Sequence, residues 1–390
     1  MTGALTIHYH RDFDGMVSAA VLAHCLRGRG EDCKDHPRTA PRTDHGPEFR
    51  VRARGAQLPA REQSEPARPR MRAMSAAAPL TIHYHRDFDG MVSAAVLAVI
   101  LGETRGESAG WRSVNYDQRG NWLEFQAGQR FAIVDFHFHP RAEYWFDHHP
   151  TTFLTPELRA QYHPSERWRW DEASPSCPPI ILAHGIEHWG LDPGPRFQDM
   201  SRWSDVIDAA RFKDVGQALF GDDPALRLSR ALAAAPDPHW SDSLVRDMVD
   251  GTLAEVAARP DVERAWQRAV RNRDLALRQF PPLVHSTDQG VVLYDASSNK
   301  IRRERFAAFF HHPDALYSVG VIPTRSGFHV TAGQNPWNQP AGVEHIGEVM
   351  ERYGGGGHKG VGGANPENLA AARRVAAEVA EELRRALQPR

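Results

Sequence analysis

The sequence predicts an α/β protein in which a doubly wound, mainly parallel sheet is followed by a smaller C-terminal α/β domain. Two observations carry this prediction. From residue 80 onwards, short apolar runs typical of strands alternate with stretches typical of helices, which is the pattern of a parallel sheet. In addition, carboxylates stand where two of these runs end, and open parallel sheets bind their ligands at the carboxyl ends of strands.

The composition is that of an ordinary globular protein large enough for two or three domains. The 390 residues are 41% hydrophobic and 25% charged, with a formal net charge of −2. The longest apolar run, residues 91–101, is too short to span a bilayer. Three cysteines provide neither a disulfide framework nor a zinc ligand set. We therefore expect a cytoplasmic protein with reduced thiols and no membrane association.

The N-terminal region contains a duplicated segment, because residues 5–23 recur without a single change at 80–98. Only one copy can occupy a given place in a sheet. The second copy leads directly into further strand-like and helix-like sequence, whereas the first leads into coil rich in Arg and Pro. We therefore take the second copy as the working one.

Residues 24–79, which follow the first copy, have the composition of a disordered chain. They hold 12 basic residues, 7 acidic residues and 7 prolines, with no isoleucine, tryptophan or tyrosine. Such a segment buries too little apolar surface to offset the entropy lost on ordering it. One interpretation is a basic arm that binds nucleic acid, and the other is a by-product of duplication or of a misassigned start codon. We favour the by-product, because acidic residues interrupt the basic ones, so residues 1–79 form a duplicated segment plus a disordered stretch.

The first folded domain is expected to span residues 80–280. Short β-rich runs predict its strands at 80–83, 111–116 and 131–135. A run of small apolar residues at 91–101 predicts a helix after the first strand. From about residue 178 the pattern is mainly helical, and a pair of prolines at 281–282 marks a domain joint.

A second, smaller α/β domain is expected over residues 283–390. Apolar alternation predicts its strands near 291–295, 316–322 and 328–332. A glycine-rich loop is expected at 354–363. Alanine and valine at helical spacing predict a final amphipathic helix at about 366–387.

Four places in the first domain concentrate side chains that bind metals. They are His83-x-His85-x-Asp87-x-Asp89-Gly90, then Asp135, then Asp147-His148-His149, and finally the pair Asp205 and Asp208. Alternate residues of an extended segment point the same way, so the first of these can converge on one site. Each place alone has a structural explanation, such as a polar turn or a helix N-cap at Asp135. Their combination at strand ends favours a metal site, and imidazole with carboxylate suits Mn²⁺, Fe²⁺ or Zn²⁺, with Mg²⁺ as an alternative.

These motifs resemble, in order, those of the DHH phosphoesterase superfamily. The matching segments are HRDFDG at 85–90, VD at 134–135, DHH at 147–149 and SDVIDAARF at 204–212. The segment YGGGGHKG at 353–360 resembles the GGGH motif of the DHH-associated domain that often follows. The resemblance covers residues 80–390 and implies a two-metal hydrolase, usually dependent on manganese.

Carried over residue by residue, the resemblance assigns a role to each metal-competent side chain. One metal would be held by His85, Asp87 and Asp135. The other would be held by Asp89, Asp135, His148 and the aspartate of the fourth motif, with Asp135 bridging. The spacing to Phe212 ranks Asp208 ahead of Asp205, and His83 stays open as a competitor for His85. Asp147 would orient a ligand, and His149 would face the scissile phosphate.

A further set of residues is expected to bind the substrate. It comprises Arg86, Gly355, Gly356, Gly357, His358 and Lys359. Consecutive glycines can present backbone N–H groups to phosphate oxygens, and a histidine and a lysine add charge-assisted contacts. The structural alternative is a flexible glycine turn before the final helix.

The expected function is hydrolysis of phosphodiester or phosphoanhydride bonds through a hydroxide activated by two Mn²⁺ ions. The substrate would be small and phosphorylated: a short oligonucleotide, a nucleoside bisphosphate or polyphosphate. Catalysis would occur in the cleft between the two domains. The alternative is a non-catalytic sensor of the same fold that binds a nucleotide or phosphate. The oligomeric state stays open, with a homodimer as one option.

Overall fold

The structure, a computed structural model, describes most of the chain from residue 79 and three short segments before it. The described residues are 4–7, 32–35, 49–52, 79–125, 130–235, 237–298, 300–324, 327–339 and 344–387. The chain divides into two compact units, Met1–Ser75 and Ala76–Arg390.

In the first unit, three short strands form an antiparallel sheet. They are β1 (Ala4–Ile7), β2 (Asp32–Asp35) and β3 (Phe49–Arg52), in the order β1-β3-β2. Strand β1 contains the start of the first copy of the repeat, and it pairs antiparallel with β3. The expected disorder of the other residues of 24–78 lies outside the described residues.

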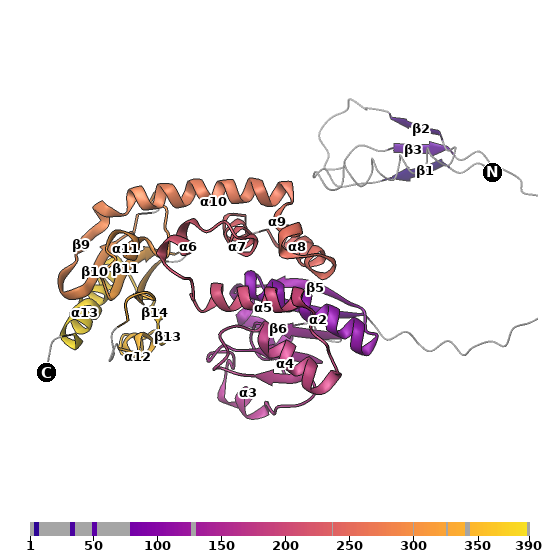
Figure 1. The fold of residues 1–390 in the computed structure, drawn as a ribbon, viewed down its shortest axis with the longest axis horizontal. Coiled ribbons are helices and arrows are strands. Elements are labelled where there is room, and N and C mark those ends of the chain that lie inside the picture. The colour runs from indigo at the N-terminus through magenta and orange to yellow at the C-terminus, as the bar shows by residue number, and fades with distance from the viewer. Residues whose placement is uncertain are drawn as a thin grey trace, which may run out of the picture. The chain divides into compact units, whose positions relative to one another are not determined.

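The second unit contains the predicted parallel sheet (Figure 1). Its strands are β4 (Leu80–His85), β5 (Ala109–Val114), β6 (Phe131–Val134), β7 (Tyr144–Asp147) and β8 (Trp168–Trp170). All neighbours pair in parallel in the order β5-β4-β6-β7-β8, which confirms the predicted fold class. The chain leaves β4 toward β5 on one side and returns to β6 on the other. Carboxyl ends of strands at such a reversal are where open α/β sheets bind ligands.

Alternating apolar residues bury both faces of this sheet. In β6, Ala132 and Val134 face one core, whereas Phe131 and Ile133 face the other. The first core is closed by a layer of helices that includes α2 (Phe88–Arg105), and the second by the 3₁₀ segment η1 (Tyr116–Glu124) and α3 (Pro156–Gln161). A strand covered on both faces needs apolar residues at every position, as β6 has.

The helical stretch expected from about residue 178 is present. It comprises α4 (Pro178–Trp189), α5 (Pro195–Asp208), α6 (Val215–Phe220), α7 (Pro224–Ala234), α8 (Pro238–Asp250), α9 (Leu253–Ala257) and α10 (Pro260–Gln279). Most of these helices begin with proline, whose fixed φ suits the first helical position and whose missing N–H leaves no donor unpaired there. Helix α10 leads from α9 to the second sheet (Figure 1).

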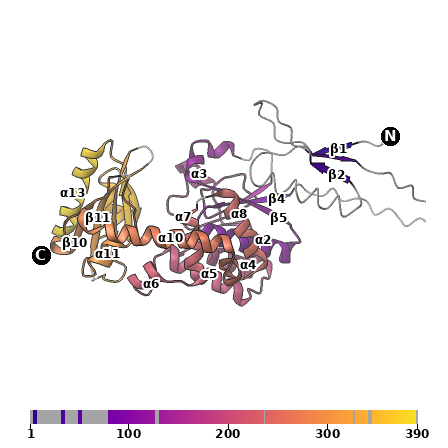
Figure 2. The ribbon, with the colours of Figure 1, turned by 90° about the horizontal axis from the view of Figure 1, so that it is seen from above.

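The second sheet is mixed and has six strands. They are β9 (Val284–Ser286), β10 (Val291–Asp295), β11 (Tyr317–Pro323), β12 (Phe328–Gln334), β13 (Gly356–His358) and β14 (Val361–Ala364), in the order β13-β14-β12-β11-β10-β9. Helix α13 (Leu369–Ala386) packs against β10, β11 and β12, as Figure 2 shows. The shorter elements are η2 (Pro281–Leu283), η3 (Asp288–Gly290), α11 (Ala307–His311) and α12 (Ile346–Glu351).

The prediction of a loop at residues 354–363 is wrong, because most of this segment forms the hairpin of β13 and β14. Its glycines allow the backbone to pack closely. A Cβ on Gly355 would lie 2.1 Å from the carbonyl oxygen of Gly363, and one on Gly357 would lie 2.3 Å from that of Val361. The close approach of the two strands therefore gives these glycines a structural reason, whether or not they also contact a phosphate.

Among the described helices, none combines the length and the apolar character needed to cross a bilayer.

Deleting residues 1–73 is expected to leave the fold of the second unit intact, since residues 76–390 form a compact unit of their own. Thermal unfolding followed by circular dichroism should give the same Tm for residues 74–390 as for the full chain. A drop of several degrees would mean that the first copy of the repeat stabilises the second unit.

Candidate metal centre

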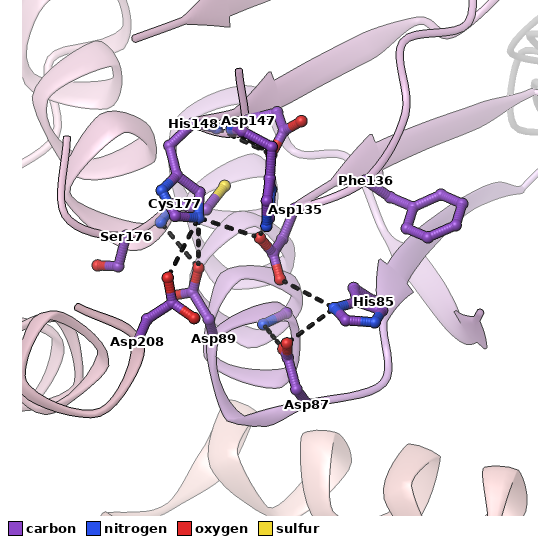
Figure 3. Close-up of polar contacts among 12 residues, drawn as sticks. His85, Asp87, Asp89, Asp135, Phe136, Asp147, His148, Ser176, Cys177 and Asp208 are labelled. Atoms are coloured by element: carbon purple, nitrogen blue, oxygen red, sulfur yellow. Dashed lines mark hydrogen bonds and ion pairs between the residues drawn. The ribbon is translucent and has the colours of Figure 1, made fainter. Parts of the chain in front are cut away.

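Acidic and histidine side chains converge at the carboxyl edge of the parallel sheet (Figure 3). Asp87 and Asp89 follow β4, Asp135 follows β6, and Asp147 is the last residue of β7. Asp208 comes from a different element, as the last residue of helix α5. Parallel strands end at one edge of a sheet, so segments far apart in sequence deliver their carboxylates to one place.

The turn between β4 and α2 positions the first two carboxylates. Asp87 is the N-cap of α2, and its side chain accepts a hydrogen bond of 2.9 Å from the backbone N–H of Gly90. A Cβ at position 90 would lie 2.0 Å from the carbonyl oxygen of His85, so only glycine fits. This tight turn sets Asp87 at the rim and leaves Asp89 buried, 3% exposed, in the first turn of the helix.

The first group of potential ligands comprises His85, Asp87 and Asp135. His85 Nδ1 lies 2.7 Å from Asp87 Oδ2 and 3.8 Å from Asp135 Oδ2. One ligand atom from each residue lies within 4.8 Å of the others, which is compact enough to hold one ion.

The second group comprises Asp89, His148 and Asp208. His148 Nε2 lies 3.6 Å from Asp89 Oδ2 and 3.5 Å from Asp208 Oδ2. The same nitrogen lies 3.5 Å from Asp135 Oδ1. The two groups therefore meet at Asp135.

Asp135 faces both groups with different oxygens, Oδ2 toward His85 and Oδ1 toward His148 (Figure 3). Its backbone has a φ of 56°, a left-handed conformation that few residues other than glycine adopt. Its amide N–H donates to the carbonyl of Phe146 at 2.9 Å, and no helix follows, so Asp135 is not a helix N-cap. Strained backbone of this kind costs roughly 1–3 kcal/mol and is typical of functional sites.

Asp147 holds the two histidines that follow it. Its Oδ1 accepts hydrogen bonds from the backbone N–H of His148 at 2.8 Å and from Nδ1 of His149 at 2.8 Å. The ring of His149 also lies 3.6 Å from Asp135 through the same nitrogen. Asp147 thus orients His149 at the edge of the cluster.

The loop between β8 and α4 supports two of the three members of the second group, His148 and Asp89. His148 Nδ1 donates to the carbonyl of Ser174 at 3.2 Å, which leaves the lone pair of Nε2 facing the carboxylates. The backbone N–H of Cys177 donates to Asp89 at 2.9 Å. Ser176 Oγ donates to Asp205 at 2.6 Å and so fastens the loop to α5.

The carboxylates interact unfavourably when no cation is present. Burial, followed by the neighbouring carboxylates, raises the pKa of Asp89 and the pKa of Asp135 well above their usual values. Burial and the charge of Asp87 likewise raise the pKa of Asp208. These three carboxyl groups therefore hold their protons to higher pH than ordinary aspartates do, and a bound cation would compete with those protons.

Two other carboxylates are paired with histidines and behave in the opposite way. Burial alone would raise the pKa of Asp87 and that of Asp147, but His85 and His149, respectively, hold them low. Burial likewise opposes the charged form of His149, and the adjacent Asp147 outweighs it, raising the pKa of His149 to about 9. His149 is therefore a cation at neutral pH.

The buried atoms of this cluster fit a bound cation. Several have no hydrogen-bond partner among the described residues, namely Asp89 Oδ1, Asp135 Oδ1, Asp135 Oδ2, Asp147 Oδ2 and His148 Nε2. Buried polar atoms are nearly always satisfied, so a group of acceptors without donors indicates a missing positive partner. Carboxylate and imidazole ligands suit Mn²⁺ and related ions.

Some of the sequence-predicted ligands lie outside these groups. His83 packs edge-on against Phe125, with ring centroids 4.6 Å apart, and burial lowers its pKa to about 4. Asp205 accepts the hydrogen bond from Ser176 and is absent from the potential metal-binding groups among the described residues. The structure thus brings His85 and Asp208 into the cluster rather than His83 and Asp205.

The predicted substrate-binding residues occupy two places. Arg86 is half-buried in the turn between β4 and α2. Gly355, Gly356, Gly357, His358 and Lys359 lie in or beside the hairpin of β13 and β14, at the edge of the second sheet. Their contact with a substrate stays a prediction.

Sequence analysis missed residues near the cluster. Ser174 and Cys177 act through backbone groups, which carry no residue-type signal. Arg305, whose charge partly offsets the rise that burial and Asp87 cause in the pKa of Asp208, lies in the basic run of residues 302–305, which could have been noticed. Tyr116, whose ring lies 4.9 Å from that of His85, left no pattern in the sequence.

Titration of the metal-free protein with Mn²⁺ is expected to release protons, because Asp89 and Asp135 hold protons in its absence. Affinity should rise with pH, since fewer protons then compete with the ion. Calorimetry in two buffers of different ionisation enthalpy, at about pH 6 and about pH 8, measures both effects. Asp135→Asn should reduce both the stoichiometry and the proton release. An enthalpy independent of the buffer would contradict this account of the cluster.

The chain resembles known proteins in its fold but not in its sequence. No protein-family model matches the chain, and no curated protein matches it. Among solved structures, the pGpG-specific phosphodiesterase PggH from Vibrio cholerae is similar with a TM-score of 0.57 and 18% identity, over 78% of this chain and 98% of that one.

RecJ from Thermus thermophilus, solved in complex with Mn²⁺, is similar with a TM-score of 0.54 and 17% identity, over 79% of this chain. The likeness spans about half of RecJ, 53% of its chain. Three observations point to the same fold. They are the strand order, the convergence of residues 147–149 with the aspartates after β4 and β6, and the likeness to these two structures. The chain therefore has the fold of the DHH phosphoesterase superfamily.

Proposed function

We propose that the protein is a metal-dependent phosphoesterase that hydrolyses a small phosphorylated substrate with two Mn²⁺ ions, or Mg²⁺ in their place. The observation that carries the proposal is the position of Asp135, whose two oxygens face two separate groups of ligand atoms. Within it, residues 80–280 would form the catalytic domain and residues 283–390 the substrate-binding domain.

The residues of the cluster suit this chemistry. His85, Asp87 and Asp135 would hold one ion, and Asp89, Asp135, His148 and Asp208 the other. Two divalent cations roughly 3.5–4 Å apart neutralise charge on a phosphoryl group and lower the pKa of water. The protein holds these buried ligands in position with hydrogen bonds. The carbonyl of Ser174 orients His148, and the backbone N–H of Cys177 orients Asp89.

His149 provides a positive charge and a proton beside the ligands. Asp147 accepts from Nδ1, and its negative charge keeps the ring protonated at neutral pH. An imidazolium in this place can neutralise a phosphate oxygen or donate a proton to the leaving oxygen. This supports the predicted role of His149 at the scissile phosphate.

A basic hollow adjoins the second group of ligands and favours an anionic substrate. It has a volume of about 380 Å³ and is lined by Ile207, which precedes Asp208, and by Arg303 and Arg305. Within the described residues, neither of these guanidinium groups makes a hydrogen bond or an ion pair, whereas Arg230 in the same hollow is paired with Glu304 at 3.2 Å. Unpaired guanidinium groups are suited to bind a phosphate that lies beyond the scissile one.

The similar proteins support the same class of reaction. PggH is described as a phosphodiesterase specific for pGpG, a small phosphorylated nucleotide, and it matches almost over its full length. RecJ was solved with Mn²⁺. A short nucleotide is therefore the first substrate to test, ahead of polyphosphate.

The alternative function is a sensor that binds a nucleotide or phosphate without hydrolysing it. A sensor needs no complete set of ligands, whereas here every ligand that the resemblance assigns to the two metals lies in one of the two groups. The complete set favours the enzyme.

Asp208→Asn and Asp205→Asn make a matched pair on helix α5 that tests the proposal. Asp208→Asn should reduce activity by more than about 100-fold, because it removes a metal ligand. Removing only the hydrogen-bond partner of a ligand typically costs roughly 10–100-fold. Asp205→Asn should retain most of the activity, since the amide oxygen still accepts from Ser176. The assay is Mn²⁺-dependent release of mononucleotide or phosphate from a short oligoribonucleotide, a nucleoside 3′,5′-bisphosphate, a cyclic dinucleotide and polyphosphate. Binding without turnover of all four would favour the sensor.

Arg305→Gln is expected to weaken binding of a substrate that carries a terminal phosphate, because Arg305 lines the basic hollow. Kinetics with a 5′-phosphorylated dinucleotide should show KM raised by about 10-fold, equivalent to one charge-assisted hydrogen bond. The same dinucleotide without the 5′-phosphate should be little affected. Arg302→Gln, in the same basic run but outside the lining of the hollow, is the matched control. Equal effects of both variants would argue for general charge rather than a site.

A further inference from the structure

One aromatic ring stands beside the metal centre without a role in it. Tyr116 begins the segment η1, two residues after the end of β5. Strand β5 pairs with β4 so that Val114 lies opposite His85. The topology of the sheet therefore places Tyr116 at the same carboxyl edge as the cluster.

Two sets of contacts hold the ring in place. The side chain of Asn115 accepts a hydrogen bond of 2.9 Å from the backbone N–H of Tyr116 and caps η1. The ring centroid lies 4.9 Å from that of His85, 5.2 Å from that of Phe136 and 5.7 Å from that of His137. Figure 3 shows His85 beside Asp87 and Asp135, whereas the ring of Phe136 points away from these carboxylates. The ring is thus fixed before any ligand arrives.

The rest of the ring is open to solvent, since Tyr116 is 49% exposed. Other large apolar side chains are exposed as well, but they lie elsewhere. Phe220 and Phe310 contact each other at 5.6 Å, and Leu123 lies further along η1. Tyr116 differs from these exposed side chains in the described part of the chain, because its ring contacts a cluster ligand, His85.

An exposed aromatic ring at this position selects among the candidate substrates. A planar base stacks on such a ring with a gain in affinity of roughly 5- to 100-fold. Polyphosphate has no apolar surface, so the ring offers it little beyond one hydroxyl group. The ring therefore favours a substrate that carries a nucleobase.

We propose that Tyr116 is a stacking platform for a nucleobase of the substrate, and that the enzyme acts on short nucleotides rather than on polyphosphate. This inference rests on the proposed phosphoesterase function. In this arrangement Tyr116 lies on the His85 side of the cluster and the basic hollow adjoins Asp208, so the base and a distal phosphate would bind on opposite groups of ligands.

The test compares a 5′-phosphorylated dinucleotide with the same compound lacking one base, using the full chain and Mn²⁺. Tyr116→Ala should raise KM for the intact dinucleotide by roughly 10-fold and leave KM for the abasic compound unchanged. Tyr116→Phe keeps the ring and should recover the parent KM. Leu123→Ala, which removes an exposed apolar side chain from the same segment, is the matched control and should change neither.

Other outcomes overturn the inference. A fall in kcat with both compounds would mean that Tyr116 only positions His85. Parent enzyme that hydrolyses polyphosphate faster than the dinucleotide would also refute it. If the parent protein hydrolyses none of the substrates, the proposed function fails. Equilibrium binding of the intact and the abasic dinucleotide to the parent and to Tyr116→Ala then tests the platform by itself. If Tyr116→Ala binds the intact dinucleotide as tightly as the parent does, the platform is refuted.

Discussion

The buried negative charge around Asp135 is the constraint on which the site depends. Its carboxylate is 1% exposed, with Asp89 and Asp147 also buried close by. Transferring such charges from water is costly unless they are paired, so the carboxyl groups take up protons or a cation neutralises them. The raised pKa values of Asp89 and Asp135 express this in the metal-free protein. The fold retains an unfavourable arrangement that a divalent ion would relieve.

The parallel sheet makes this arrangement possible. Strands β4, β6 and β7 end side by side, so residues as distant in the chain as His85 and Asp147 meet at one edge. The apolar residues of β6 face two cores and hold the strand, while the left-handed backbone at Asp135 turns its carboxylate between the two ligand groups. Burial of apolar side chains in the two cores stabilises the sheet. The backbone strain at Asp135 is small compared with the free energy gained from that burial.

A layer of hydrogen bonds behind the ligands sets their chemical state. Asp147 keeps His149 protonated, whereas the carbonyl of Ser174 keeps His148 in the tautomer whose Nε2 can bind a metal. The backbone N–H of Cys177 adds a donor to Asp89, and Asp205 fastens the loop that provides it. These supports explain why residues without metal-binding character are needed for the site.

The sequence by itself determined the features that depend on local spacing. Alternation set the strands, proline set the starts of most long helices, and Gly90 suits the tight turn from β4 into α2. Tertiary structure decided what depends on packing between distant segments. It placed Asp208 toward His148 and Asp205 toward Ser176, made a hairpin of the glycine-rich segment, and set Tyr116 against His85. Backbone periodicity is fixed within a few residues, whereas the direction in which a helix or loop presents its side chains depends on the burial of apolar surface against segments far away in the chain.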